Sequence, residues 1–414
     1  MTERIARVEL YHFAYPLPAT FYPSWIPGFP QTENRCTLVR IITTGGVEGW
    51  SAGPALARER RGLGDLLGPY LLGEVAGVGL IQQRLREMSY LGWRNWWIEP
   101  AIWDIVGKIE DKPVCALLGA GVPAVRVYAS TGQLRTPPEL IARAEAHRDE
   151  GFDTIKLRVH EDEATDEQVV RETTAAVGAE LSIGVDANQA WRVSIIADAP
   201  RWDLDRATRF ARLCADAGVA WLEEPLPMDD YEGLTELTRR SPLPIAGGEL
   251  HTAGYPELAM MAARRCYSIF QPDAMFTGGI DQTFRLIRLL RDFGLGYTPH
   301  TWTNGVGLAV NLHLLAASGF AEETQLEYPL DPPGWVPEAR DAMLERPFLH
   351  DRGVLAVPDG PGLGIAIDRS ALRKHGRRFF AMDRKRLVVS ALRERGIKGA
   401  RAIDAARRAR AGRF

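Results

Sequence analysis

The chain has few cysteines, no long apolar run and no strong net charge, and each shortage excludes a class of protein. No apolar run could cross a bilayer and no signal-peptide pattern is present, so we expect a cytoplasmic protein with no membrane partner. A net charge of -3 argues against nucleic acid as a partner. The cysteines are scattered without a pairing motif, which predicts buried, reduced thiols rather than disulfides or nucleophiles: Cys36, Cys115, Cys214 and Cys266.

The first third of the chain reads as a small α+β domain. At 414 residues the chain is long enough for two domains. Residues 15–34 are rich in proline and aromatic residues, which predicts a long loop rather than a helix or a central strand. Antiparallel strands are predicted on either side of this loop and after a Gly-Gly turn, at residues 5–16, 35–42 and 47–51. Helices are predicted at residues 58–72, 79–90 and 95–118, so residues 1–122 predict an α+β capping domain.

From residue 123 onward, short apolar runs alternate with helical patterns. This rhythm predicts an α/β fold, with a (β/α)8 barrel over residues 123–330. The predicted strands are VRVYAS, TIKLRV, LSIGVD, VAWLEE, LPIAGGE, SIFQPD, GLGYTPH and TQLEY. Residues 331–383, rich in Pro and Gly, are expected to return to the cap. Residues 384–414 form a tail with 11 Lys or Arg and two acidic residues, which predicts a solvated helix or a frayed end more than a basic contact surface.

Three acidic residues each close an apolar run: Asp186, Glu223 and Glu249. A carboxylate at the end of a buried strand is costly unless something neutralises it. With Lys156, Asp273, His300 and Glu327, these residues recur 24 to 37 positions apart. That is about one strand-helix unit of roughly 25–35 residues, so all should meet at the carboxyl-terminal mouth of the barrel. Oxygen ligands without nearby Cys or His favour Mg²⁺ over Zn²⁺.

Basic residues are predicted to lie beside this cluster. Lys156 and Arg158 share one face of their strand, because side chains alternate with a period of two. Two cations inside a barrel mouth can bind a substrate carboxylate, and a buried lysine can also transfer protons. Asp273 and His300 end neighbouring strands, and such a pair holds imidazole in one tautomer as a general base. Glu327 is expected near the substrate carboxylate or, as the structural alternative, in a salt bridge.

Other polar residues carry weaker signals. Asn188 shares a face with Asp186 and is expected to bind substrate or a metal-bound water, with an Asx turn as the alternative. Of the adjacent pair in LEEP, we assign Glu223 as the metal ligand and place Glu224 behind it. His251 is favoured as an ordinary loop histidine over a role above the metal. Asp104 and Lys108, four apart on a predicted helix, are expected to form a structural ion pair.

A metal, two cations and a His–Asp base suit removal of a weakly acidic proton α to a carboxylate, with an enediolate stabilised opposite the base. At this point the sequence resembles the enolase superfamily, in its mandelate racemase subgroup, over about residues 1–370. The resemblance rests on ordered motifs: KxR, DANQAW, WLEEP, GGE, QPDAMFTGG, TPHTWTNGVG, LEYPL and the segment WDIVGKIEDKPVCALLG.

The resemblance implies site residues and a class of reaction. It implies Mg²⁺ on Asp186, Glu223 and Glu249, an Asp273–His300 dyad and Glu327 as the acid near the substrate carboxylate. It also implies a lid around Phe21, Trp25 and Phe29, and a homo-oligomer. Trp25 in this lid and Trp302 in TPHTWTNGVG are expected, with Asn188, to bind the substrate.

One departure from the subgroup decides between reactions. The subgroup often has lysine where this chain has Arg158, and arginine stays protonated, so it is a poor base. Racemisation needs acid–base groups on both faces of the substrate, whereas dehydration needs only one. The sequence therefore favours dehydration of an acid sugar (aldonate or aldarate) to a 2-keto-3-deoxy acid. A racemase or epimerase is the second interpretation, and a barrel that binds a carboxylate without turnover is the third.

Overall fold

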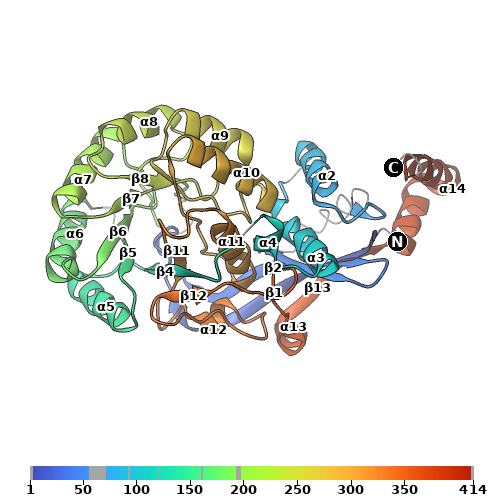
Figure 1. Ribbon diagram of the computed structural model, residues 1–414, viewed down its shortest axis with the longest axis horizontal. Helices are drawn as coiled ribbons and strands as arrows, with labels where there is room; N and C mark the ends of the chain where they lie inside the picture. Colours follow the sequence, from blue (N-terminus) through green and yellow to red (C-terminus); the bar gives the residue numbers. More distant parts are fainter. Residues whose placement is uncertain are drawn as a thin grey trace.

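The computed structural model describes residues 3–55, 71–91, 94–119, 121–159, 162–192 and 197–411. Figure 1 shows a ring of strands and helices beside an antiparallel sheet, with a C-terminal helix that projects away from both. The predicted fold class is confirmed, because parallel strands follow chain order around a barrel and an antiparallel sheet with helices caps it.

The antiparallel sheet joins the two ends of the described chain. Its strands lie in the order β13-β1-β2-β3, with bounds β1 (Ile5–Phe21), β2 (Gln31–Thr43), β3 (Glu48–Gly53) and β13 (Gly376–Asp383). The buried carboxylate of Glu9 on β1 ties three strands together, because it accepts hydrogen bonds from Arg7, Arg40 on β2 and Arg378 on β13. Burial raises the pKa of Glu9, but the Tyr11 hydroxyl and the guanidinium groups of Arg7 and Arg40 outweigh it and lower that pKa to about 2.

The loop predicted for residues 15–34 is wrong in part. Strand β1 runs on through Pro16 and Pro18 to Phe21, and β2 already begins at Gln31, so the connection is much shorter. The physical reason lies in the pairing of β1. Strand β13 pairs with β1 only as far as Phe13, so beyond that point β1 is an edge strand on one side. Proline, which lacks an N–H, is tolerated on such an edge.

The helices of the cap differ from the prediction at one point. Helix α2 (Val78–Leu91) confirms the helix predicted at 79–90. The single helix predicted at 95–118 is wrong, since the segment forms η2 (Trp96–Ile98), α3 (Pro100–Glu110) and α4 (Val114–Leu117). Asp111 has a left-handed φ of 52°, which ends α3, and Pro113 caps α4. The helix predicted at 58–72 lies almost wholly outside the described residues.

Eight parallel strands form the barrel in the described part of the chain. Hydrogen bonds join them in the order β10-β9-β8-β7-β6-β5-β4-β11, and the Thr298 hydroxyl donates to the Gln325 carbonyl, 2.6 Å away, between the two terminal strands. Their bounds are β4 (Ala124–Ser130), β5 (Thr154–Arg158), β6 (Ser182–Asp186), β7 (Trp221–Glu223), β8 (Ile245–Gly247), β9 (Ile269–Phe270), β10 (Gly296–Tyr297) and β11 (Leu326–Pro329).

Helices follow the strands and surround the ring (Figure 1). Several begin at a polar residue whose side chain accepts a hydrogen bond from the first turn, among them Asp162, Asp203, Asp230 and Asn304. These caps fix where each loop ends, and so how each strand end is presented. The helices are α5 (Pro137–Asp149), α6 (Glu163–Val177), α7 (Leu204–Asp216), α8 (Tyr231–Arg240), α9 (Tyr255–Ala263), α10 (Gly279–Asp292) and α11 (Gly305–Ala317).

After the barrel the chain returns to the cap and then leaves it. The connecting segment holds α12 (Pro337–Arg340), β12 (Val354–Ala356), which pairs with β4, and α13 (Arg369–His375). Strand β13 then joins the antiparallel sheet, and α14 (Arg384–Ala411) follows with a kink at Gly396. Among the described residues, no helix is both long and apolar enough to cross a membrane.

Candidate functional site

The carboxyl-terminal mouth of the barrel gathers the charged residues that the sequence singles out. Each lies at or just beyond the end of a parallel strand, and each is at least nine-tenths buried: Lys156, Arg158, Asp186, Glu223, Glu249, Asp273, His300 and Glu327. They come from β5 to β11 and meet because strands of one parallel ring end at the same edge.

Lys156 is the hub of this cluster. Its ammonium lies 2.6 Å from Glu223 Oε1 on β7, 2.6 Å from Glu327 Oε1 on β11, and 3.7 Å from Asp186 Oδ2 on β6. Burial lowers the pKa of Lys156, but Glu223 and Glu327 outweigh it and raise that pKa above its ordinary value. These two carboxylates therefore hold Lys156 as a cation in this arrangement of the mouth.

Arg158 lies two residues after Lys156, on the same face of β5 and nearer to its carboxyl-terminal end. Its guanidinium pairs with Asp186, and its Nε donates to the Thr131 carbonyl at 2.7 Å. The guanidinium also lies over the rings of Trp25 and Trp302, with centroids 5.4 Å and 5.7 Å away. Arg158 is thus held between a carboxylate and two indoles, as a cation facing the mouth.

The mouth carries more negative than positive charge. Six carboxyl groups are buried there, those of Asp186, Glu223, Glu224, Glu249, Asp273 and Glu327, against the permanent cations of Lys156 and Arg158. Burial raises the pKa of Asp186 to about 7 even though Arg158 pairs with it, and Glu223 adds to the rise. Burial and the charges of Glu249 and Asp186 raise the pKa of Glu224 well above its ordinary value.

This charge imbalance fits a divalent cation. Glu224 Oε2 is buried and has no hydrogen-bond partner among the described residues. The donor set is all oxygen, which suits a hard ion such as Mg²⁺. Within the described ranges, however, no three His, Cys, Asp or Glu side chains lie close enough together to hold a metal ion. Asp186 and Glu223 instead turn toward Arg158 and Lys156.

The Asp273–His300 pair has the geometry of an oriented base. His300 Nδ1 lies 3.1 Å from Asp273 Oδ2, so Nδ1 carries the proton that the carboxylate accepts. The other ring nitrogen, Nε2, lies 3.1 Å from Glu249 Oε2. Burial lowers the pKa of His300, but Glu249, Glu327 and Asp273 outweigh it and raise that pKa to about 9. The amide of Asn311 on α11 donates to both partners, at 2.9 Å to Asp273 Oδ1 and 3.1 Å to the His300 carbonyl.

Glu327 is fixed by donors on each of its oxygens. Oε1 accepts from Lys156 and from the Ser130 hydroxyl at 2.8 Å, and Oε2 accepts from the Thr301 backbone N–H at 2.7 Å. Burial raises its pKa, but Lys156, His300 and Arg158 outweigh it and lower that pKa to about 2. Glu327 is therefore an anion here, and the salt bridge expected as the structural alternative is present.

An aromatic lid from the cap covers the mouth. Trp25 packs edge-on against Trp302, with centroids 5.2 Å apart, and Phe21 stacks on Trp302 at 5.8 Å. The Trp302 indole N–H donates to the Ser130 hydroxyl at 2.8 Å, which links the lid to Glu327. A cavity of about 190 Å³ lies between cap and barrel, lined by Trp25, Trp302, Trp335, Arg35, Met275 and Asn304 among others.

Of the residues with weaker sequence signals, some lie at the mouth and others lie away from it. Asn188 Oδ1 accepts from the Ser24 hydroxyl at 2.7 Å and contacts Arg158, so it lies at the mouth and also binds the cap. His251 is buried, and its Nδ1 lies 3.0 Å from Glu257. Lys108 binds Asp104 at 2.7 Å, which confirms the structural ion pair. Phe29 is about one-third exposed and, unlike Phe21, is not part of the buried aromatic cluster around Trp335.

Sequence reasoning missed several residues that shape the site. Ser130 ends β4 and Gln271 directly follows β9, so counting in steps of two from Tyr128 or back from Asp273 would have found them. Asn311 gives no such signal, because it lies within a helix whose thirteen residues are almost all buried. Trp191, whose indole donates to Glu249 at 2.7 Å, lies in a loop and has no periodic signal either.

The fold and the site together define a class of enzyme, a barrel whose mouth is acidic and is covered by a lid from the cap. The Enolase C-terminal domain-like family matches residues 139–371, and the Mandelate racemase / muconate lactonizing enzyme N-terminal domain family matches residues 19–119. The chain belongs to the enolase superfamily, in its mandelate racemase subgroup.

Known relatives cover most of the chain. It is 27% identical over 354 residues to the D-galactarolactone cycloisomerase of Agrobacterium fabrum, covering 81% of this chain and 89% of that protein. It is 29% identical over 287 residues to the arabinonate dehydratase of Saccharolobus solfataricus, covering 65% and 68%. The crystal structure of L-talarate/galactarate dehydratase from Salmonella typhimurium LT2, liganded with Mg and L-lyxarohydroxamate, has the same fold. Its TM-score is 0.77 at 24% identity, with 92% of this chain and 94% of that chain covered.

The charge imbalance predicts opposite effects of two matched substitutions. Glu327→Gln removes an anion that accepts from three donors and should lower the free energy of unfolding by about 1.5–3 kcal/mol, because hydrogen bonds to charged groups are lost. Glu224→Gln removes a crowded carboxyl with an unpaired oxygen and should leave that free energy unchanged or higher. Urea unfolding in EDTA measures both, and equal destabilisation would contradict this picture of the mouth.

Proposed function

We propose that this protein is a Mg²⁺-dependent dehydratase of an acid sugar, an aldonate or aldarate, and that it forms a 2-keto-3-deoxy acid. The observation that carries the proposal is the asymmetry of the mouth. One oriented imidazole, His300, lies on one side, and a permanently charged guanidinium, Arg158, lies on the other. Relatives that are acid-sugar dehydratases support the substrate class.

His300 Nε2 would move the proton once Glu249, which lies 3.1 Å from it, binds Mg²⁺ instead, since Nδ1 is held by Asp273. Nε2 takes the proton from the carbon α to the substrate carboxylate, and the C–H electron pair passes into that carboxylate as an enediolate. The resulting imidazolium then gives the proton to the β-hydroxyl as the C–O bond breaks, so water leaves. The enol that remains becomes the 2-keto-3-deoxy acid. One group thus serves both steps on one face of the substrate.

Lys156 and Arg158 stabilise charge rather than exchange protons. Arginine stays protonated across the physiological range, and Lys156 is held as a cation by Glu223 and Glu327. Asp186, Glu223 and Glu249 would hold Mg²⁺, which supplies a Lewis acid for the developing enediolate when bound.

The runner-up is an isomerase of the same kind of substrate. A cycloisomerase among the relatives supports it, because such a reaction can begin with the same proton transfer at the same carbon. A racemase or epimerase would need a second base where Arg158 stands. A carboxylate-binding barrel without turnover would show no exchange of the α-proton. A panel of acid sugars, assayed for 2-keto acid, would identify the substrate and separate these alternatives.

We also propose that the protein is a homo-oligomer with α14 as a contact. Four exposed apolar side chains lie on this helix: Val388, Val389, Leu392 and Ile397. Residues 384–414 hold 11 of the 50 Lys and Arg but only two of the 53 Asp and Glu, so their net charge is +9 and the rest of the chain carries -12. A basic, partly apolar helix complements the acidic body of a second copy. Sedimentation at micromolar concentration should show an assembly, and a monomer alone would contradict this.

Removal of the metal should abolish activity. Treatment with EDTA is expected to stop 2-keto acid formation, and added Mg²⁺ should restore it, because the buried carboxylates need a cation. Glu249→Gln should weaken Mg²⁺ binding and lower activity by about 10²-fold or more. Glu236→Gln, on the exposed face of α8, serves as the matched control and should match the wild type. Full activity in a metal-stripped sample would refute the metal assignment.

Loss of the base should stop both halves of the reaction. His300→Asn is expected to lower dehydration and α-proton exchange together, by about 10²–10⁴-fold or more, because one group acts twice. His375→Asn, on α13 in the cap, is the matched control and should keep both activities. Dehydration is followed as 2-keto acid and exchange by NMR in D₂O. Loss of dehydration with full retention of exchange would show that another group takes the proton.

A further inference from the structure

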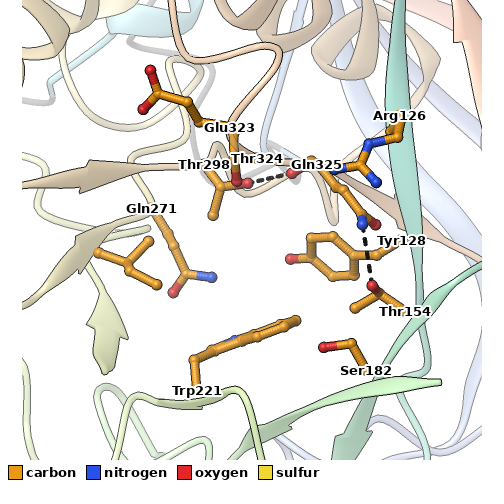
Figure 2. A pocket seen from close by; sticks show the side chains of 11 residues that line it. Arg126, Tyr128, Thr154, Ser182, Trp221, Gln271, Thr298, Glu323, Thr324 and Gln325 are labelled. Carbon is orange, nitrogen blue, oxygen red and sulfur yellow. Dashed lines mark hydrogen bonds between the residues drawn. The ribbon is translucent and has the colours of Figure 1, made fainter. Parts of the chain in front are cut away.

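The interior of the barrel below the mouth is polar and hollow. Barrel interiors are usually filled by layers of branched aliphatic side chains. Here a cavity of about 180 Å³ enters the ring from the amino-terminal ends of the strands, where Arg126, Ser182 and Glu323 are exposed, and we call it the lower chamber. Its walls include inward-facing residues one step below the charged cluster: Tyr128, Trp221, Gln271 and Thr298 (Figure 2). Gly184 makes room for the Trp221 indole, because a Cβ there would lie 2.1 Å from Trp221 Cζ2.

Three buried polar atoms around the lower chamber have no hydrogen-bond partner among the described residues. They are Tyr128 Oη, Gln271 Oε1 and Gln325 Oε1. Figure 2 shows the Tyr128 hydroxyl and the Gln271 amide pointing into the same space, and both residues are only 2% exposed. Buried polar atoms in proteins are nearly always bonded to protein or to water. At ~30 Å³ for each water, the chamber has room for several.

Gln271 connects this chamber to the charged cluster. Its Nε2 donates to Glu223 Oε2 at 2.7 Å, and the Trp221 indole N–H reaches the same oxygen at 3.2 Å. Lys156 binds the other oxygen of Glu223. A carboxylate has about four acceptor positions, so these three donors leave about one and fix its direction. The amide cannot turn over, since its oxygen would then face a carboxylate that only accepts.

We propose that the lower chamber holds ordered water that anchors the oxygen of the Gln271 amide, and that Gln271 is a positioning residue that aims Glu223 at Mg²⁺. This inference rests on the proposed metal site. It adds a second set of contacts beneath that site, on the side of the barrel away from the substrate. Water bonded to Gln271 Oε1 keeps the amide nitrogen turned toward Glu223, so that Glu223 would have about one acceptor position left for Mg²⁺.

The test compares two glutamines that line the same chamber. Gln271→Met keeps the length of the side chain and removes both amide contacts, so the Kd for Mg²⁺ measured by calorimetry without substrate should rise about 10–100-fold. Gln325→Met is the matched control, because its amide donates to Asp153 and Thr154 at the outer end of the chamber and does not contact Glu223. Its Mg²⁺ affinity should stay close to that of the wild type. Saturating Mg²⁺ should restore kcat in Gln271→Met, which a structural lesion would not allow.

The possible results distinguish a failure of the positioning role of Gln271 from a failure of the proposed metal site. Wild-type affinity in Gln271→Met, or equal weakening in Gln325→Met, would overturn the positioning role while leaving the metal site intact. A wild type that binds no Mg²⁺ would refute the metal site and this inference with it. If circular dichroism shows that Gln271→Met does not fold, Tyr128→Phe decides. Without the Tyr128 hydroxyl the ordered water loses a hydrogen-bond partner, so the Kd for Mg²⁺ should rise as in Gln271→Met. An unchanged Kd would refute the proposal that water in the lower chamber anchors Gln271.

Discussion

The ion pairs of Lys156 hold the centre of this protein together. One buried ammonium reaches Glu223 on β7, Glu327 on β11 and Asp186 on β6, so a single charge connects strands from several parts of the ring. Buried carboxylates are tolerated only when they are paired, and without this cation their mutual repulsion would be large. Even so, six carboxyl groups face two permanent cations, and the remaining negative charge explains why the mouth suits a divalent ion.

The same arrangement makes the mouth asymmetric. Asp273 and Asn311 hold His300 in one orientation from β9 and α11, while Asp186, Trp25 and Trp302 hold Arg158 as a cation on the other side. Of these two held groups, His300 can gain and lose a proton, whereas Arg158 stays charged. The lid contributes to this asymmetry directly, because Trp25 from the cap and Trp302 from the barrel both lie against Arg158, and Trp302 reaches Glu327 through Ser130. Cap and barrel therefore build one site.

Much of this was visible in the sequence, for a physical reason. Strands of a parallel barrel end at one edge, so a polar residue repeated once per strand–helix unit marks that edge, and Asp186, Glu223, Glu249, Asp273, His300 and Glu327 all follow the rule. The failures have other causes. Pro16 and Pro18 lie in a strand because β13 does not reach them, and the break at Asp111 depends on a single left-handed residue. Asn311 comes from a helix that is buried almost throughout, and the hollow beneath Glu223 depends on how Trp221 packs over Gly184. These features arise from tertiary packing, which local patterns do not record.

The central claim is that the mouth has one working base, and isotope exchange tests it most directly. Both C2 epimers of an accepted acid sugar are incubated with the Mg²⁺-loaded wild-type enzyme in D₂O, and loss of the α-proton signal is followed by NMR. The account predicts rapid exchange or dehydration of the epimer whose α-proton faces His300, and negligible exchange of the epimer whose α-proton faces Arg158. Exchange of both epimers at comparable rates would show two working bases and would contradict the account in favour of racemisation.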